Sequence, residues 1–381
     1  MDLNYSDEQT MLRESVDRFV REEYSFQRRQ QLLATEAGYS EELWRQYAEL
    51  GWLSMPFSEE DGGVGGSAVD VAIIMEGVGR GLILEPYLPS IMAGRLIAAL
   101  GSSSQKANYL APLMEGRIKL ALAFAEPQSR YDLRDCGTIA KAHGAGFSIN
   151  GRKSVVIGGH AADIFVVLAR TGGSPTDKEG LSLFLLDRKD RGLEIRPYRT
   201  NDGTGAAELV LREVVVEQDR LLGGSGIAFE ALEEVVDFGI ACIAAEATGI
   251  MDALCAATLD YLKTRKQFGK TLGDNQALQH RMADMVIATE EARSSALYGA
   301  LMMNERDGSA RLRALSLAKI EIGRTGTKVG QEAVQLHGAM GMTEELAVGH
   351  FFKRLTAIGA TFGDAGWHTY RVSSLDGPVI G

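Results

Sequence analysis

One stretch in the middle of the chain constrains the fold most, because its pattern differs from the pattern on both sides. Residues 119–222 contain short runs rich in β-branched and aromatic residues, such as "DIFVVLAR" and "LSLFLLD", separated by turn residues. Asn150-Gly151, between alternating residues, favours a tight hairpin because both residues accept positive φ. The pattern is not that of a βαβ nucleotide-binding fold. We predict a small antiparallel β domain over 119–222.

The residues on either side follow helical periods. In residues 1–118, Ser6 and Gln9 form an S-x-x-Q capping box ahead of apolar residues spaced by three or four, and Ser40 can cap a later helix. Residues 223–381 contain longer helical segments. One of them has a continuous apolar stripe made of Leu315, Ala318, Ile322, Thr325, Val329, Ala333 and Leu336. The predicted fold is therefore α+β, with an N-terminal helical domain, a β domain and a C-terminal four-helix bundle that also buries surface against other subunits.

Composition excludes several classes of function. The net charge of −11 and the lack of Lys/Arg runs argue against nucleic acid as a partner. We see no apolar run of about 18 residues, which argues against a membrane span. The first residues lack the basic flank and apolar core of a signal peptide, so we expect a cytoplasmic protein. The cysteines, at 136, 242 and 255, are scattered and give no metal or disulfide pattern.

Four segments resemble the acyl-CoA dehydrogenase family. "YLKTRKQFGKTLGDNQALQHRMADM" (261–285) is similar to its R-x-x-F-G segment and the helix that follows, and "QEAVQLHGAMGMT" (331–343) to its Q-x-x-G-G-x-G segment. "FSINGRKSVV" and "MPFSEEDGGVGG" match two further family segments in the same order, so the resemblance covers about residues 5–365. It implies the family's α–β–α fold and oxidation of the Cα–Cβ bond of an acyl-CoA thioester. FAD would accept the hydride and a glutamate would take the proton.

The resemblance also implies a set of cofactor-binding residues. Arg265 matches the arginine that reaches the flavin pyrophosphate of a neighbouring subunit, a role that suits its fixed charged fork. Other matched positions are Phe268 beside it, Asn275 and Gln276 near the same cofactor, and Gln335, Leu336, Gly338 and Ala339 along the adenosine end. Ala339 stands where the family usually has a second glycine. His337, in the same loop, is interpreted as structural. We assign no metal ligand.

The residues expected to bind flavin on this chain's own β domain depart from the family pattern. After Glu126-Pro127 the chain has "QSRYD" in place of the small Gly-Ser-Asp turn, and the bulky Arg130 and Tyr131 would close the pocket. Residues 154–157 are Ser-Val-Val-Ile in place of Trp-Ile-Thr. The aromatic and hydroxyl contacts to the flavin are therefore missing.

The position of the catalytic base departs from the family as well. The usual glutamate falls on Phe362, followed by the expected Gly363. The alternative base position falls on Gly239, and the arginine that helps hold CoA falls on Ile240, although Asp237 is kept. We therefore assign no catalytic residue to this chain.

Three interpretations remain open. The first is a base-less subunit of a heteromeric, α2β2 acyl-CoA dehydrogenase. Its partner subunit would carry the glutamate, its substrate would be an acyl-CoA, and its electron acceptor an electron-transfer flavoprotein or similar protein. "AFAEPQSRYDL" and "GHFFKRLTAIGATFGDA" resemble the small subunits of such enzymes. The second is an active homotetramer with a displaced base, Asp364 or Glu126, although an acid placed like Asp364 is usually a helix cap. The third is a non-enzymatic helical scaffold.

Overall fold

The computed structural model describes residues 5–267 and 269–375, and its chain divides into two compact units. The first, which we call the helical unit, comprises Met1–Gln31, Ala68–Ile83 and Ile240–Gly381. The second, the sheet unit, comprises Leu32–Ser67 and Leu84–Gly239. The α+β class and its order of helical, β and helical parts are confirmed. The boundaries 1–118, 119–222 and 223–381 stay a prediction.

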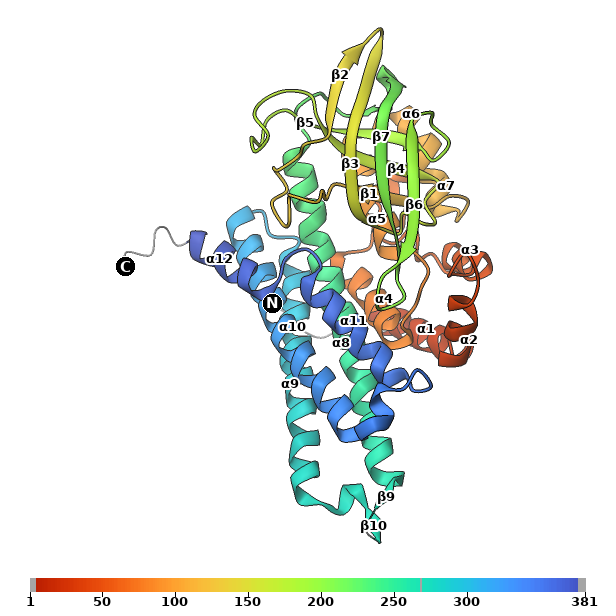
Figure 1. The fold of residues 1–381 in the computed structure, drawn as a ribbon, viewed down its shortest axis with the longest axis vertical. Helices are drawn as coiled ribbons and strands as arrows, with labels where there is room; N and C mark the ends of the chain where they lie inside the picture. The colour runs from red at the N-terminus through yellow and green to blue at the C-terminus, as the bar shows by residue number, and fades with distance from the viewer. Residues whose placement is uncertain (1–4, 268, 376–381) are drawn as a thin grey trace. The chain divides into compact units, whose positions relative to one another are not determined.

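An eight-stranded sheet organises the sheet unit (Figure 1). Its strands are β1 (Leu120–Ala123), β2 (Ile139–His143), β3 (Gly146–Ile157), β4 (Ile164–Arg170), β5 (Leu181–Asp187), β6 (Leu193–Arg199), β7 (Gly205–Glu217) and β8 (Leu221–Leu222). The order is β6-β7-β3-β2-β4-β5-β8, with β1 beside β4. The predicted antiparallel pairing holds for most neighbours. The exceptions are β1 and β2, which pair with β4 in parallel. The hairpin predicted at Asn150-Gly151 is wrong, because both residues lie inside β3 at a register shift, and the turn between β2 and β3 falls at Gly144-Ala145.

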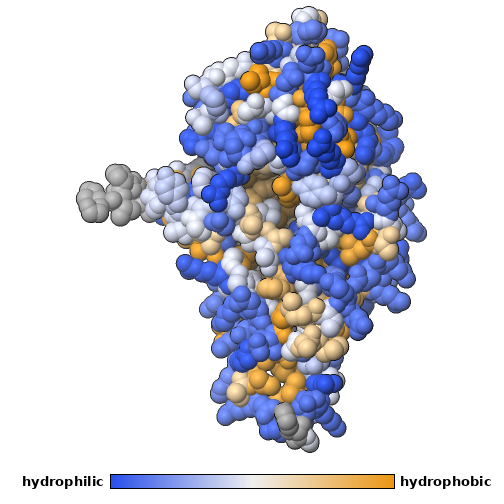
Figure 2. Space-filling view, in the orientation of Figure 1, coloured by the Kyte–Doolittle hydropathy of each residue, from blue (hydrophilic) through white to orange (hydrophobic). Residues whose placement is uncertain are grey.

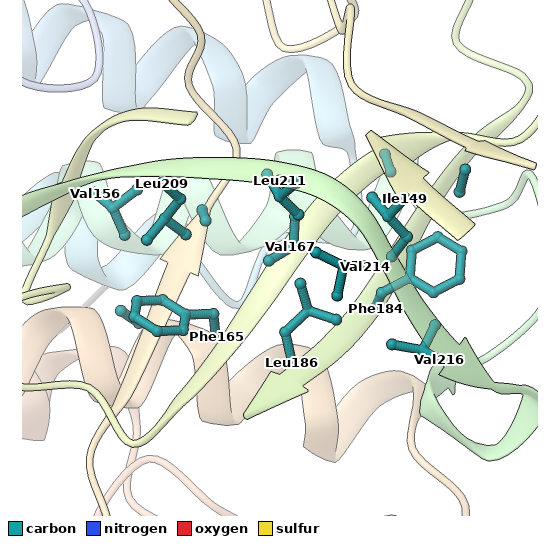
Figure 3. Close-up of a cluster of buried hydrophobic side chains, with 14 of the residues drawn as sticks. Ile149, Val156, Phe165, Val167, Phe184, Leu186, Leu209, Leu211, Val214 and Val216 are labelled. Carbon is teal, nitrogen blue, oxygen red and sulfur yellow. The ribbon is translucent and has the colours of Figure 1, made fainter. Parts of the chain in front are cut away.

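A continuous apolar cluster fills one face of this sheet (Figure 3). Phe165 and Phe184, on the neighbouring strands β4 and β5, are fully buried. Phe147 meets Phe184 edge to face, with ring centroids 5.1 Å apart. Every residue of β4 is buried, which explains why "IFVVLA" is an unbroken apolar run and does not alternate.

Short helices complete the sheet unit. They are α3 (Glu41–Glu49), η1 (Glu59–Asp61), α5 (Tyr87–Leu100), α6 (Ser103–Gln105), η2 (Lys106–Leu110), α7 (Ala111–Met114) and η3 (Gln218–Arg220). The predicted cap at Ser40 is confirmed, because its hydroxyl accepts the backbone N–H of Leu43 at 3.2 Å.

Long helices make up the helical unit. They are α1 (Asp7–Glu23), most of α2 (Phe26–Leu33), α4 (Ala68–Gly81), most of α8 (Phe229–Thr264), α9 (Gln276–Met302), α10 (Gly308–His337), α11 (Ala347–Ala360) and α12 (Ala365–Leu375). The capping box at Ser6 and Gln9 is confirmed. All seven residues of the predicted stripe on α10 are buried. The periodic pattern therefore identified the face of α10 that packs into the bundle.

Helix α8 corrects one expectation. It contains an 18-residue window with a mean hydropathy of 1.6, apolar enough to cross a membrane by composition alone. However, 78% of that window is buried inside the protein, as in the core helix of a soluble protein. The helix is apolar around most of its circumference because other elements cover it.

Two glycines allow α4 and α8 to approach closely within the helical unit. A Cβ added to Gly79 would lie 2.0 Å from the carbonyl oxygen of Glu246, and one added to Gly249 would lie 1.9 Å from that of Glu76. Each helix thus places a glycine against a backbone carbonyl of the other. Only glycine fits such a reciprocal contact without movement of the helices.

Candidate functional site

Arg265 follows directly after α8, at a small two-stranded hairpin. The backbone N–H of Arg265 donates to the carbonyl of Tyr261 at 2.8 Å, and its own carbonyl accepts from Leu272 N–H at 2.9 Å. The hairpin strands are β9 (Lys266–Gln267) and β10 (Lys270–Thr271). The Arg265 side chain is exposed and makes no hydrogen bond or ion pair with any described residue. Its fixed charge is therefore available to an external anion.

Other cations lie near Arg265. Lys266 and Lys270 on the hairpin and Lys263 in the last turn of α8 are exposed. The acids on either side are the exposed Asp260 of α8 and Asp274, which accepts the backbone N–H of Thr271 at 3.0 Å. The hairpin is thus a basic region in a chain whose net charge is −11. Phe268, the other residue predicted here, lies outside the described residues.

Asn275 and Gln276 lie at the start of α9, after the short turn η4 (Leu272–Asp274). The half-buried Asn275 side chain donates to the carbonyl of Leu272 at 3.0 Å, so it shapes the turn. Gln276 is exposed at the first position of the helix. Of these two side chains, that of Gln276 is the more accessible to a ligand.

The last turn of α10 and the short helix η5 (Gly338–Met342) carry the other predicted residues. Gln335, Gly338 and Ala339 are exposed, and Gly338 has a φ of +62°. Leu336 differs, because it belongs to the apolar stripe and is only 6% exposed. Its side chain packs in the bundle, so only its backbone could contact a ligand.

Two contacts bring the segments 261–285 and 331–343 together at one end of the helical unit. The rings of Tyr261 and His337 stack with centroids 4.4 Å apart, and Arg281 on α9 donates to Glu332 on α10 at 2.6 Å. This end lies at the bottom of Figure 1, and the space-filling view shows hydrophilic and apolar surface mixed there (Figure 2). The predicted residues, far apart in sequence, therefore share one region.

His337 contributes to this arrangement as a structural residue. Its Nδ1 lies 2.8 Å from the carbonyl of Ala333. A carbonyl only accepts, so Nδ1 carries the proton. Burial lowers the pKa of His337, which favours the neutral ring. The structural interpretation made from the sequence is confirmed.

The turn between α11 and α12 carries Phe362, at the position expected for a base. Phe362 has a φ of +56°, unusual for a residue other than glycine. His368 Nε2 lies 3.0 Å from the Phe362 carbonyl, and Lys319 donates to the carbonyls of Gly359 at 3.0 Å and Gly363 at 2.7 Å. These contacts to carbonyls hold the turn independently of the side chain at 362. The phenyl ring cannot accept a proton.

Asp364, the nearby acid, caps α12. Its Oδ1 accepts the backbone N–H of Trp367 at 2.8 Å, and its carbonyl accepts that of His368 at 3.0 Å. The capping interpretation is confirmed.

Glu126, the other acid considered as a base, is enclosed in the sheet unit. Lys153 Nζ lies 2.6 Å from its Oε1, and the backbone N–H groups of Gly137 and Thr138 donate to it at 2.7 and 3.0 Å. Burial raises the pKa of Glu126, but the charge of Lys153 and the hydrogen bonds outweigh burial and hold the pKa at about 2. A carboxylate with so low a pKa is a weak base at neutral pH. The sequence reasoning missed Lys153, which the structure shows buried on β3.

A strained bulge lies on β3, at the positions where flavin-facing residues are expected from the sequence. Val155 has a φ of +51° and is 52% exposed, within an irregularity of the β3–β7 register. Glu208 on β7 accepts from the N–H of Val155 at 3.2 Å, from Ser154 Oγ at 3.1 Å and from Arg152 at 2.9 Å. The Glu208 carboxylate therefore occupies hydrogen-bond donors of β3 that a ligand bound here would otherwise use. Sequence reasoning also missed Glu208.

The other departures noted in the sequence lie on described elements. Gly239, Ile240 and Asp237 are buried positions of α8. In the turn after Glu126, Arg130 is exposed with a φ of +45° and Tyr131 is half-buried. Closure of the pocket by these two residues stays a prediction.

Family models match almost the whole chain. The acyl-CoA dehydrogenase N-terminal domain matches residues 6–117, the middle domain 121–218 and the C-terminal domain 226–369. The chain therefore belongs to the acyl-CoA dehydrogenase family. Members of this family are oxidoreductases that use FAD.

Individual proteins agree with this assignment. The chain is 30% identical over 360 residues to the short-chain specific acyl-CoA dehydrogenase of Clostridium acetobutylicum, covering 91% of this chain and 92% of that protein. A solved structure described as a Tcur3481-Tcur3483 steroid ACAD G363A variant is 28% identical, with a TM-score of 0.86 and coverage of 97% and 98%. A structure of the ChsE4-ChsE5 complex from Mycobacterium tuberculosis has a TM-score of 0.89 and full coverage of both chains. At 22% identity it shows only the shared fold.

Proposed function

We propose that this chain is the base-less subunit of a heteromeric, α2β2 acyl-CoA dehydrogenase and that its hairpin end completes the FAD site of a neighbouring subunit. The proposal is carried by a contrast within the helical unit. At one end, Arg265 is exposed with no described partner for its charge. At the turn after α11, Phe362 stands where a base is needed. The chain retains residues suited to bind a partner's cofactor but lacks a catalytic base of its own.

The residues proposed to contact FAD are those matched from the family. They are Arg265, Phe268, Asn275, Gln276, Gln335, Gly338 and Ala339, together with the backbone of Leu336. Arg265 would bind the diphosphate through charge-assisted hydrogen bonds. Bound FAD would supply hydride acceptance, and the partner subunit would supply the glutamate. On this chain's own sheet, the carboxylate of Glu208 and the absence of the aromatic contact disfavour a flavin.

The substrate and partners are proposed from resemblance. "AFAEPQSRYDL" and "GHFFKRLTAIGATFGDA" are most like the small subunit of pimeloyl-CoA dehydrogenase. This favours CoA thioesters of dicarboxylic acids, or bulkier acids derived from steroids or bile acids. The similar structure described as a steroid ACAD, named for two chains, supports the second class and the heteromer. We further propose an electron-transfer flavoprotein or similar protein as acceptor, a cytoplasmic location, and neither nucleic acid nor membrane as a partner.

The alternatives fit the described residues less well. A homotetramer with a displaced base would need Asp364, which caps a helix, or Glu126, whose pKa of about 2 makes it a weak base. A non-enzymatic scaffold has no evident use for an exposed Arg265 that pairs with none of the described residues and lies beside a basic hairpin.

The test of this function is Arg265→Ala in the complex formed by co-expression with a subunit that carries the glutamate. Loss of charge-assisted hydrogen bonds, each worth about 1.5–3 kcal/mol, predicts flavin binding about tenfold to a hundredfold weaker. The unfolding midpoint should change little because the side chain is exposed. Arg306→Ala is the matched control, because Arg306 is also exposed but follows the far end of α9. Equal flavin content in both variant complexes would overturn the role of Arg265.

A further inference from the structure

A buried histidine joins α11 to α2 behind the η5 turn. His350 on α11 is 6% exposed, and its Nδ1 lies 3.3 Å from NH1 of Arg29 on α2. On its other side, His350 Nε2 lies 3.3 Å from the carbonyl of Glu344 and 3.1 Å from a carboxylate oxygen of the same residue. Phe26 packs against the imidazole edge to face, with ring centroids 5.1 Å apart. The imidazole therefore bridges α2 and the segment 343–346.

The partners of His350 determine its protonation. Arg29 only donates hydrogen bonds, so Nδ1 accepts and Nε2 carries the proton. The side-chain amide nitrogen of Gln30 lies farther from Nε2, at 3.5 Å, and makes no hydrogen bond to it in this tautomer. The proton on Nε2 then points to Glu344, whose oxygens only accept. Arg29 is itself fixed by its Nε, which donates to the carbonyl of Leu82 at 3.0 Å. The side-chain amide of Gln30 donates to the same Glu344 carbonyl at 3.0 Å, so two side chains hold this one backbone group.

The segment anchored in this way continues directly from the η5 turn. The N–H and hydroxyl of Thr343 donate to the carbonyl of Met340 at 3.2 and 2.9 Å. A Cβ on Gly349 would lie 3.1 Å from the carbonyl of Gly341, so α11 begins close against η5. Movement of residues 343–346 would therefore be transmitted to Gly338 and Ala339.

We propose that neutral His350, protonated on Nε2, is a positioning residue that latches segment 343–346 to α2 and so fixes the turn that carries Gly338 and Ala339. The connection to flavin rests on the proposed function, whereas the latch is a property of this chain alone. Such a latch orders the turn before the partner arrives, which reduces the entropy lost on binding.

The latch opens as the pH falls. The charged groups facing the ring are Arg29 from α2, Glu344 from the connecting segment and Lys353 from α11. Burial and Arg29 lower the pKa of His350 and outweigh the opposing effect of Glu344. Protonation would place an N–H on Nδ1 against the Arg29 guanidinium. Because the folded pKa lies below the unfolded one, the latch is intact at neutral pH and is lost as the pH falls through the folded pKa.

The test is made on the chain alone, with two measurements. Nitrogen NMR of the histidine rings, of which the chain has six, should show His350 protonated on Nε2 and not on Nδ1 at about pH 7.5. Amide hydrogen exchange of residues 338–346, corrected for intrinsic rates, should accelerate as the pH is lowered from about 7.5 to acid values below the ordinary histidine pKa of about 6.5, by at most about tenfold per pH unit.

Two variants and one control separate the latch from general packing. His350→Gln keeps an acceptor for Arg29 and a donor for Glu344 but cannot titrate, so it should retain protection at neutral pH and lose the acid acceleration. His350→Leu should lose protection at both pH values. His280→Gln, at an exposed position of α9, should behave as wild type. A proton on Nδ1 at neutral pH, or an unchanged pH profile in His350→Gln, would overturn the latch.

The connection to the cofactor is measured separately in the assembled complex. His350→Leu should reduce flavin retention severalfold, whereas His350→Gln should not. Flavin retained fully in His350→Leu would overturn the positioning role even if the tautomer were correct. If Arg265→Ala also retained flavin, the proposed function itself would fail, so the two failures are distinguishable.

Discussion

Asp364, two residues after Phe362, provides a test of whether this chain supplies the base. As a cap that accepts the Trp367 N–H, it should tolerate Asp364→Asn, because asparagine keeps an acceptor oxygen. Turnover of the assembled complex, measured with an artificial electron acceptor at saturating substrate and constant flavin, should stay within a few-fold of wild type. A general base behaves differently, since its loss typically costs about a hundred- to ten-thousand-fold. A drop of that size would make Asp364 the base.

His368 gives a prediction about acid stability. It is fully buried, and its Nδ1 lies 3.1 Å from Ser316 Oγ. Burial lowers the pKa of His368 to about 4, so between about pH 6.5 and about pH 4 the unfolded chain binds more protons than the folded one. Folding stability should therefore decrease as the pH falls through this window, by an amount on the order of 2–3 kcal/mol from this residue.

Urea unfolding of wild type and His368→Gln from neutral to acid pH measures this contribution. Glutamine can still donate to the Phe362 carbonyl but does not titrate, so the stability difference between the two proteins should change with pH. Burial also lowers the pKa of His160 to about 4. Because His160 is present in both proteins, its contribution to the pH dependence cancels in the comparison. Parallel curves would show that His368 contributes nothing to the acid response.

At the scale of secondary-structure elements, the crossing of α4 and α8 depends on glycine. Gly79→Ala would place a Cβ 2.0 Å from the Glu246 carbonyl and force the helices apart. We expect a loss of about 1–3 kcal/mol in the free energy of unfolding. Gly359→Ala, in α11, is the matched control, because its Cβ would meet nothing within 4 Å. It should be neutral or slightly stabilising. Equal effects would show that the close approach is unimportant.

Local chemistry made many elements predictable. The Ser6 and Ser40 caps and the buried stripe on α10 depend on residues a few positions apart. The local sequence is therefore sufficient to predict them. The Glu126–Lys153 pair, the Glu208 contacts and the Gly79–Glu246 approach each join positions distant in sequence. No local pattern encodes which distant partner a residue meets. The buried lysine and the strained Val155 were therefore found only in the structure.

At the scale of the whole molecule, the candidate site was predictable only through family resemblance. By itself, the local sequence around Arg265 indicates only the exposed end of a helix. The local sequence around Gln335 indicates only a polar residue near another helix end. The structure brings the two segments together through the Tyr261–His337 stack and the Arg281–Glu332 pair. Composition and periodicity gave no indication of those contacts, because they depend on how the helices pair.

The assembly of the molecule with a partner is the central claim of this account. Three observations favour a chain that contributes to a partner's flavin site but has no complete flavin site of its own. They are the exposed Arg265, which pairs with no described residue, the phenylalanine at position 362, and the Glu208 contacts on β3. The most direct measurement is the flavin content and acyl-CoA dehydrogenase turnover of the purified chain alone and after co-expression with a glutamate-carrying subunit. We predict a colourless, inactive chain alone and a yellow, active complex. A yellow, active protein from the single chain would contradict this prediction.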